Sequence, residues 1–158
     1  MQLKDRTMSR QYIAAVFGHP NAVGTVDAPM DRHRTQRTKM AVVTSGKPAV
    51  THYRVIERTA HVSWLSVKLE SGRTHQIRVH LTHIGHPLVG DPVYRQGRIG
   101  LGRASQEARQ CIEDFPRQAL HAEALGLLHP GSSEPLSFSA PLPDDLVGLR
   151  VNLERHDV

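Results

Sequence analysis

The chain has 158 residues, a length that suits one domain with a single hydrophobic core, so we expect one domain over residues 1–158. Lysine and arginine number 20 against 15 aspartates and glutamates, and the net charge of +5 favours a polyanionic partner such as nucleic acid. The single cysteine excludes an internal disulfide, and no apolar run is long enough to span a bilayer, so we expect a cytoplasmic protein outside the membrane.

The first predicted elements are β-strands. Residues 10–18 have the composition of a strand and end in a Gly-His-Pro-Asn turn. Residues 49–58 and 61–70 form a predicted hairpin, because apolar and polar side chains alternate along the second segment at the period of a half-buried strand. We therefore expect this hairpin to pack one face and to leave the other in water.

A helix is predicted next, from residue 74 to residue 84, because the apolar period changes there and Gly85 follows as a stop signal. Residues 120–124 and 136–140 alternate again and predict two further strands. Asp144 or Asp145 can cap a last helix that ends near residue 154. Many strands with few, segregated helices predict an α+β fold with a largely antiparallel sheet and flanking helices.

Residues 32–39 are strongly basic, with four permanent cations, one histidine and no acid. These charges repel one another in a strand or loop, and a bound polyanion would offset that repulsion. Arginine suits phosphate because its planar fork donates two parallel hydrogen bonds. The alternative is a solvated basic loop. We predict RNA contacts from five of these side chains: Arg32, His33, Arg34, Arg37 and Lys39.

A second basic stretch covers residues 71–81, where a strand ends, Gly72 permits a tight turn and the predicted helix begins. The free amides of a helix amino terminus attract anions. Arg78 lies among apolar neighbours, so we expect it to be partly buried and to need an anionic partner. We predict RNA contacts from the first residues of this stretch: Arg73, His75 and Gln76.

Four histidines occur close together in this region, namely His75, His80, His83 and His86, at spacings that a metal site could use. The chain has no HExxH motif and no paired cysteines, and no carboxylate appears in the cluster before Asp91. The alternative is a set of histidines that line a polar groove or bond the backbone. We predict no metal.

The run SGRTHQIRVHLTHIGHPLVGDPVY at residues 71–94, with SRQYIA at 9–14, KPAVTHY at 47–53 and ALHA at 119–122, resembles the RluA/RluD family of RNA pseudouridine synthases, above all its large-subunit ribosomal RNA enzymes. The resemblance extends from about residue 3 to about residue 145. It implies a mixed, mainly antiparallel sheet with a central RNA-binding cleft. It also implies a reaction, without a cofactor, that cuts the N-glycosidic bond of uridine, turns the base and rejoins it through carbon. The implied partner is a large-subunit ribosomal RNA stem-loop whose base leaves its stack, and we expect a monomer.

The resemblance gives roles to three residues of this chain. Tyr12 lies on the target base and acts in proton transfer, Ile77 forms an apolar wall of the pocket, and Arg78 pairs with the nucleophilic aspartate. A core tyrosine on a strand is the alternative for Tyr12. The family's nucleophile lies in a His-Arg-Leu-Asp-like segment upstream of the tyrosine strand, and this chain contains no Arg-Leu-Asp. We therefore expect an amino-terminally truncated, inactive catalytic domain in which Arg78 lacks the family's aspartate. In that case Arg78 either recruits a substitute anion, from solvent or from a neighbouring side chain, or turns out to water, and Arg78→Met is close to neutral or stabilising.

None of the aspartates Asp5, Asp27 and Asp31 has the sequence context of the family's nucleophile. Asp91 lies in the GDPVY loop, where we expect it to cap or hydrogen-bond the backbone. Two hypotheses follow for function. The full-length parent is a uridine isomerase, and this chain is either part of that enzyme or a catalytically inactive RNA-binding fragment.

Overall fold

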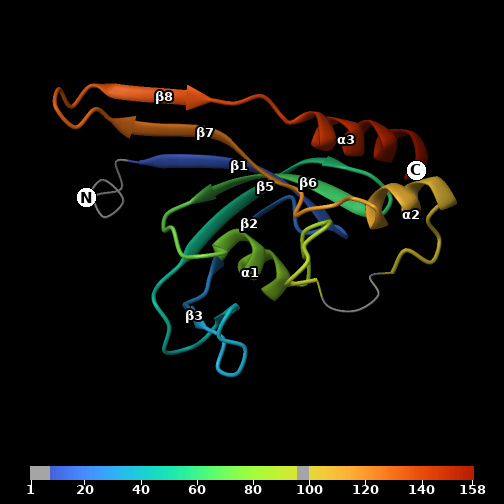
Figure 1. Ribbon diagram of the computed structural model, residues 1–158, viewed down its shortest axis with the longest axis horizontal. Helices are drawn as coiled ribbons and strands as arrows, with labels where there is room; N and C mark the ends of the chain where they lie inside the picture. The colour runs from blue at the N-terminus through green and yellow to red at the C-terminus, as the bar shows by residue number, and fades with distance from the viewer. Residues whose placement is uncertain (1–7, 96–99) are drawn as a thin grey trace.

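The computed structural model describes residues 8–95 and 100–158, and these residues form a six-stranded sheet and a separate two-stranded ribbon (Figure 1). Every pairing between the named strands is antiparallel, which confirms the predicted α+β fold with a mainly antiparallel sheet. In spatial order the sheet contains β2 (Val23–Asp27), β5 (Val50–Arg58), β6 (Val62–Leu69), β1 (Ser9–Phe17), β7 (Leu120–Leu128) and β8 (Pro135–Ser139). The ribbon pairs β3 (Met30–Arg32) with β4 (Met40–Val42).

Strand β1 lies inside the sheet, and residues 13–17 of it are buried on both faces. Because successive side chains point to opposite faces, Ala14 and Val16 enter the core beneath α1 (Gln76–His83). The neighbouring positions, Ile13 and Ala15 among them, enter the opposite core, which α2 (Gln106–Glu113) and α3 (Asp144–His156) cover. Figure 1 shows α1 and α3 on opposite sides of the sheet. The helices therefore hold β1 from both sides, and its first residues lie at an end of the sheet that α3 does not cover.

The predicted wet face of the β5–β6 hairpin exists only in part. Leu65 and Val67 pack in the core under α1, as the alternation predicted. Val62 and Trp64, however, are equally buried on the other face, in the core that contains α3. Only towards the end of β6 does the second face meet water, at exposed Lys68. The prediction was wrong for the first half of β6, because local alternation does not show that a distant helix covers the polar-looking face.

The last helix begins differently from the prediction. Pro143 is the N-cap and its side chain forms no capping hydrogen bond, so the expected N-cap position of Asp144 or Asp145 is wrong, although Asp145 Oδ1 does accept the first-turn N–H of Leu146 at 2.8 Å. Both aspartates instead lie in the first turn, where a negative charge is favourable to the helix dipole. Asp145 also forms an ion pair with Arg117 at 2.7 Å. None of the helices in residues 8–95 and 100–158 is both long and apolar enough to cross a membrane.

Candidate active site and RNA-contact surface

A hollow of about 220 Å³ opens where β1, the end of β6, the start of α1 and the start of β7 meet. It brings Tyr12 together with residues 72–78, which the sequence separates by some sixty positions. No carboxylate is among the described residues that line it. Its lining consists of Arg10, Tyr12, Leu69, Gly72, Arg73, His75, Gln76, Ile77, Arg78, Gln118 and Leu120.

Tyr12 lines this hollow next to a β-bulge between β1 and β7. Gln11 pairs with Ala124 of β7 but Tyr12 pairs with Ala122, so Glu123 is an extra residue in β7. Such β-bulges bend a strand and redirect side chains, and they are frequent next to active sites. Tyr12 is half-buried and packs against the same core cluster as Ile77, so both side chains flank the hollow from opposite elements.

Gln76, the first residue of α1, joins three segments of the chain through hydrogen bonds of its side-chain amide. Its amide nitrogen donates to the Val50 carbonyl and to the Thr51 hydroxyl, each at 3.0 Å. Its amide oxygen accepts from the Ser71 hydroxyl at 2.9 Å and from the Arg73 N–H at 3.0 Å. The side chain is 2% exposed, and both of its N–H groups are used. The amide therefore holds the segment after β6 to β5, and the predicted contact of Gln76 with RNA stays a prediction, since the residue also lines the hollow.

Arg78 is buried, as expected, and it has a partner inside the chain. Its Nε and Nη2 donate to the two carboxylate oxygens of Asp91, each at 2.8 Å. Asp91 also accepts the backbone N–H groups of Val93 and Tyr94, which confirms its predicted bonding to backbone. Burial alone would raise the pKa of Asp91, but the hydrogen bonds from Arg78 and the two amides outweigh it and hold that pKa below its usual value. Of the two outcomes expected for Arg78, a substitute anion from a neighbouring side chain is the one that the structure shows, and the side chain does not turn out to water.

His75 and Tyr94 connect this pair to the basic ribbon. His75 precedes α1 in a left-handed conformation with φ of 56°, and its Nδ1 lies 2.7 Å from the Tyr94 hydroxyl oxygen. That oxygen accepts the N–H of Met40, the first residue of β4, at 2.9 Å. Arg78 stacks over the Tyr94 ring with its guanidinium carbon 4.9 Å from the centroid. Burial, and then the charge of Arg78, lower the pKa of His75, so its imidazole is neutral at pH 7.

The other histidines of the cluster do not converge. The Nε2–H of His80 donates to the Ala28 carbonyl at 2.9 Å, which leaves Nδ1 to accept from the Thr51 hydroxyl at 2.8 Å. His86 bonds the Phe17 carbonyl through Nδ1 at 2.8 Å. Within the described part of the chain, no three histidine, cysteine or acidic side chains are placed to hold a metal ion. Internal and backbone bonding, the alternative interpretation of these histidines, accounts for His80 and His86.

The basic stretch forms the loop of the β3–β4 ribbon, which extends away from the sheet (Figure 1). The loop has its own order, because the His33 N–H donates to the Lys39 carbonyl at 2.9 Å and the Arg32 guanidinium donates to the Arg37 carbonyl at 3.0 Å. His33 Nδ1 accepts two loop amides, so only its other nitrogen is free for a ligand. Arg34 and Arg37 are exposed, and no ion pair joins the loop's cations to a described acid.

The aspartates are spread away from the hollow. Asp27 and Asp31 lie in β2 and β3, and Asp91 is occupied by Arg78 and two amides. Asp5 lies outside the described residues. Arg10 was not predicted from the sequence, although it lies two residues before Tyr12 and so on the same face of β1, a period-two signal that could have found it.

Comparison with known proteins agrees with this geometry. The sequence model of the family described as RNA pseudouridylate synthase matches residues 1–83, which is 83 of 158 residues. The chain belongs to this family. The match contains Tyr12 and the hollow-lining segment from Gly72 to Arg78, whereas Gln118 and Leu120 of the lining lie outside it.

Among curated relatives, ribosomal large subunit pseudouridine synthase D of Pseudomonas aeruginosa is 53% identical over 157 residues, covering 99% of this chain and 48% of the relative. The protein of the same name from Nitrosomonas europaea is 52% identical over 148 residues, covering 94% and 42%. The chain thus spans about half the length of the curated relatives that it matches. The structure of human RNA pseudouridylate synthase domain containing 1 aligns with a TM-score of 0.75 and 29% identity, covering 96% of this chain and 61% of that one.

Proposed function

We propose that this chain belongs to an isomerase that converts uridine to pseudouridine in large-subunit ribosomal RNA, and that the hollow receives the uracil. The observation that carries the proposal is the convergence of Tyr12, Ile77 and Arg78 on one hollow that other basic side chains also line. The names of the curated relatives supply the substrate, large-subunit ribosomal RNA.

The reaction is an isomerisation, so its atoms balance within the nucleotide. The bond from ribose C1′ to uracil N1 breaks, a bond from C1′ to C5 forms, and the proton on C5 leaves while N1 gains one. In our proposal Tyr12 lies against the uracil ring and serves the proton transfer at C5, while Ile77 excludes water from the opposite wall. The unpaired base is drawn from a loop, where leaving the stack costs least.

The hollow lacks one part of this chemistry, because the described residues that line it include no carboxylate. We therefore propose that the 158-residue chain binds RNA but does not itself form pseudouridine. The second candidate function, an inactive RNA-binding fragment, rests on the same observation. The two candidates differ in one respect. In the isomerase, a carboxylate from outside this chain completes the site, and in the RNA-binding fragment none does.

The experiment is to incubate the purified chain with ribosomal RNA and measure pseudouridine by nucleoside chromatography, with the intact mass of the protein verified. We expect binding without turnover. A chain extended upstream through a His-Arg-Leu-Asp-type segment should form pseudouridine, and Tyr12→Phe in that extended chain should slow it. An Asp5→Asn variant serves as the control for the one early aspartate outside the described residues. Turnover by the 158-residue chain would contradict the proposal.

A further inference from the structure

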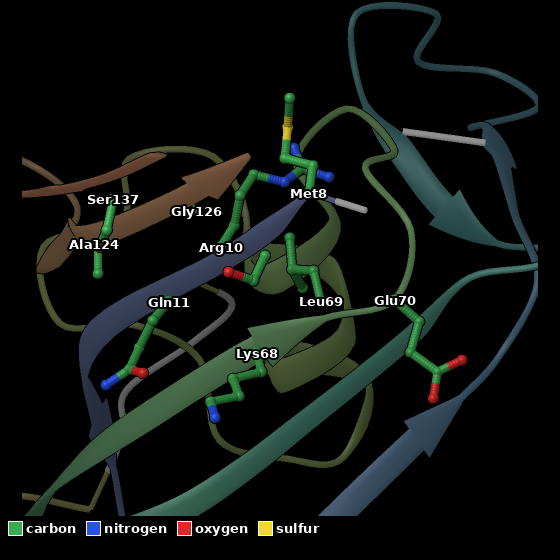
Figure 2. A pocket seen from close by; sticks show the side chains of 10 residues that line it. Met8, Arg10, Gln11, Lys68, Leu69, Glu70, Ala124, Gly126 and Ser137 are labelled. Carbon is green, nitrogen blue, oxygen red and sulfur yellow. The ribbon is translucent and has the colours of Figure 1, made fainter. Parts of the chain in front are cut away.

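Arg10 borders three hollows, one of which, of about 300 Å³, is also lined by Tyr12 and Glu123. It lines the candidate hollow with Tyr12, and it also lines a larger neighbouring hollow of about 390 Å³ (Figure 2). The larger hollow lies at the end of the sheet where β1 begins and β6 ends, and Leu69 belongs to both linings. Arg10 is half-buried, so part of the residue remains open to solvent.

Gly72 makes room for the Arg10 guanidinium. A Cβ at Gly72 would lie 2.4 Å from Nη2 of Arg10, 2.8 Å from Nη1 and 3.0 Å from Cζ. The φ angle of Gly72 is not positive, so the backbone does not require glycine at this position. The sequence predicts that Gly72 is needed for a tight turn. In the structure, the close approach of the Arg10 guanidinium from β1 explains the absence of a side chain at this position.

Arg10 has no partner among residues 8–95 and 100–158, since no hydrogen bond or ion pair reaches its guanidinium there. The other two arginines of the hollow differ from it. Arg78 is neutralised by Asp91, and Arg73 donates its Nε to the Pro48 carbonyl at 3.1 Å. A guanidinium offers five N–H donors in a planar fork. Half-buried and without an acidic partner among the described residues, Arg10 has the properties of a site for an external anion.

We propose that Arg10 binds the RNA phosphate next to the nucleotide whose base occupies the candidate hollow, and that Gly72 is the residue that permits it. This inference rests on the proposed function, because it takes RNA as the ligand. A chain with one base in the candidate hollow brings its adjoining phosphate to the wall, where Arg10 lies. The interior of the larger hollow suits a phosphate less well, because the acidic side chain of Glu70 is among its lining residues.

The test uses fluorescence anisotropy with a single-stranded RNA decamer that contains one uridine. Arg10→Gln should weaken binding about tenfold at low salt and reduce the slope of log affinity against log salt by about 0.7, the value for one phosphate contact on a single strand. Arg10→Lys keeps the charge but loses the fork, so it should keep the slope and lose part of the affinity. A decamer with an uncharged methylphosphonate linkage beside the uridine should bind the original chain as weakly as Arg10→Gln binds normal RNA.

Gly72→Ala provides a test that changes no charge. The new methyl group displaces the guanidinium, which is the end of a flexible side chain, so the affinity should fall while the melting temperature stays near its original value. Combining Gly72→Ala with Arg10→Gln should weaken binding no further than Arg10→Gln alone. Gly102→Ala is the matched control, because its Cβ would have no neighbour within 4 Å, and it should bind normally.

The outcomes separate this inference from the proposed function. If the original chain does not bind the decamer, both are overturned. If it binds and Arg10→Gln binds equally well, only the role of Arg10 is wrong. If Gly72→Ala weakens binding to the same extent in the Arg10→Gln background, the glycine acts through the loop and not through Arg10, and the inference is again overturned.

Discussion

Replacing Arg78 with methionine is expected to destabilise the chain strongly. The Arg78 side chain is 9% exposed and that of Asp91 is fully buried, and two bonds of 2.8 Å join them. Methionine keeps apolar bulk but removes the cation, so Asp91 retains only its bonds from the Val93 and Tyr94 amides. The sequence alone favours the opposite outcome, a neutral change, because it offers no partner for Arg78.

The magnitude follows from the uncompensated carboxylate. Removing one partner of a buried pair costs about 3–5 kcal/mol, whereas replacing both partners together is often close to neutral. At roughly 2–4 °C per kcal/mol for a chain of this size, the melting temperature should fall by about 6–20 °C. Arg78→Met combined with Asp91→Asn should recover most of the loss, because asparagine still offers an oxygen to the two amides and carries no charge.

The dependence on pH provides an independent check of this cause. In the original chain the pKa of Asp91 is lowered, so its contribution to stability is present above the ordinary carboxyl pKa and is lost as the pH falls through the lowered value. Without Arg78, burial dominates and raises the pKa of Asp91 above the ordinary value. The destabilised variant can then relieve its buried charge by protonation. The stability difference between the two proteins should therefore shrink as the pH falls from 7 towards 4.

Urea and thermal unfolding of the original chain, the two single variants and the double variant measure these quantities. Arg34→Met is the matched control, because Arg34 is exposed on the loop, and it should stay within about 0.5 kcal/mol of the original chain. A loss in Arg78→Met below about 1 kcal/mol, or a double variant as unstable as the single, would refute the reasoning from the buried pair.

Three further predictions follow from other parts of the structure. Arg34→Ala combined with Arg37→Ala should weaken RNA binding and flatten its salt dependence by about 0.7 for each single-strand phosphate that the loop no longer binds, and an unchanged slope would mean that the loop is only solvated. Burial lowers the pKa of His80. As the pH falls through about 6.5, the imidazole is therefore protonated in the unfolded chain while it stays neutral in the folded chain. The contribution of His80 to the free energy of unfolding should thus fall by up to about 1.4 kcal/mol per pH unit below that value, and His80→Gln should reduce the slope in urea titrations, leaving the part that comes from His75, whose pKa is also lowered. Gly148→Ala in α3 should raise stability by about 0.5–1 kcal/mol, since its Cβ would meet nothing within 4 Å; a lower melting temperature would contradict this.

The long strands and the helix after Gly72 could be predicted because their signals are local. The alternation in β6 and the change of period before α1 each depend on a few adjacent residues. Strands β3 and β4 have three residues each, which is too short for a period to show. Helix α2 was not predicted either, although Ser105 caps it by accepting the Ala108 N–H.

The candidate site was predictable in part of its members and not in their bonding. The motifs around Tyr12 and Arg78 predict much of the lining of the hollow, but they do not predict Arg10, Gln118 or Leu120. The need of a buried guanidinium for an anion follows from the apolar neighbours of Arg78. That Asp91 is this anion depends on how the chain turns after α1 to bring a residue thirteen positions away against Arg78. The internal role of Gln76 likewise depends on β5, which lies some twenty-five residues earlier in the sequence.

The pairing of Arg78 with Asp91 leaves part of the guanidinium free, and this bears on how a site lacking a carboxylate could be completed. Asp91 takes Nε and Nη2, so Nη1 and the second hydrogen of Nη2 stay without a bond to the described residues. That unused edge belongs to a residue that lines the hollow. A second carboxylate could approach it without displacing Asp91, which would then act as the fixed support that orients the fork. Under the proposed function, the role that the family resemblance gives to Arg78 and its bond to Asp91 are compatible, because one guanidinium has enough donors for both acids.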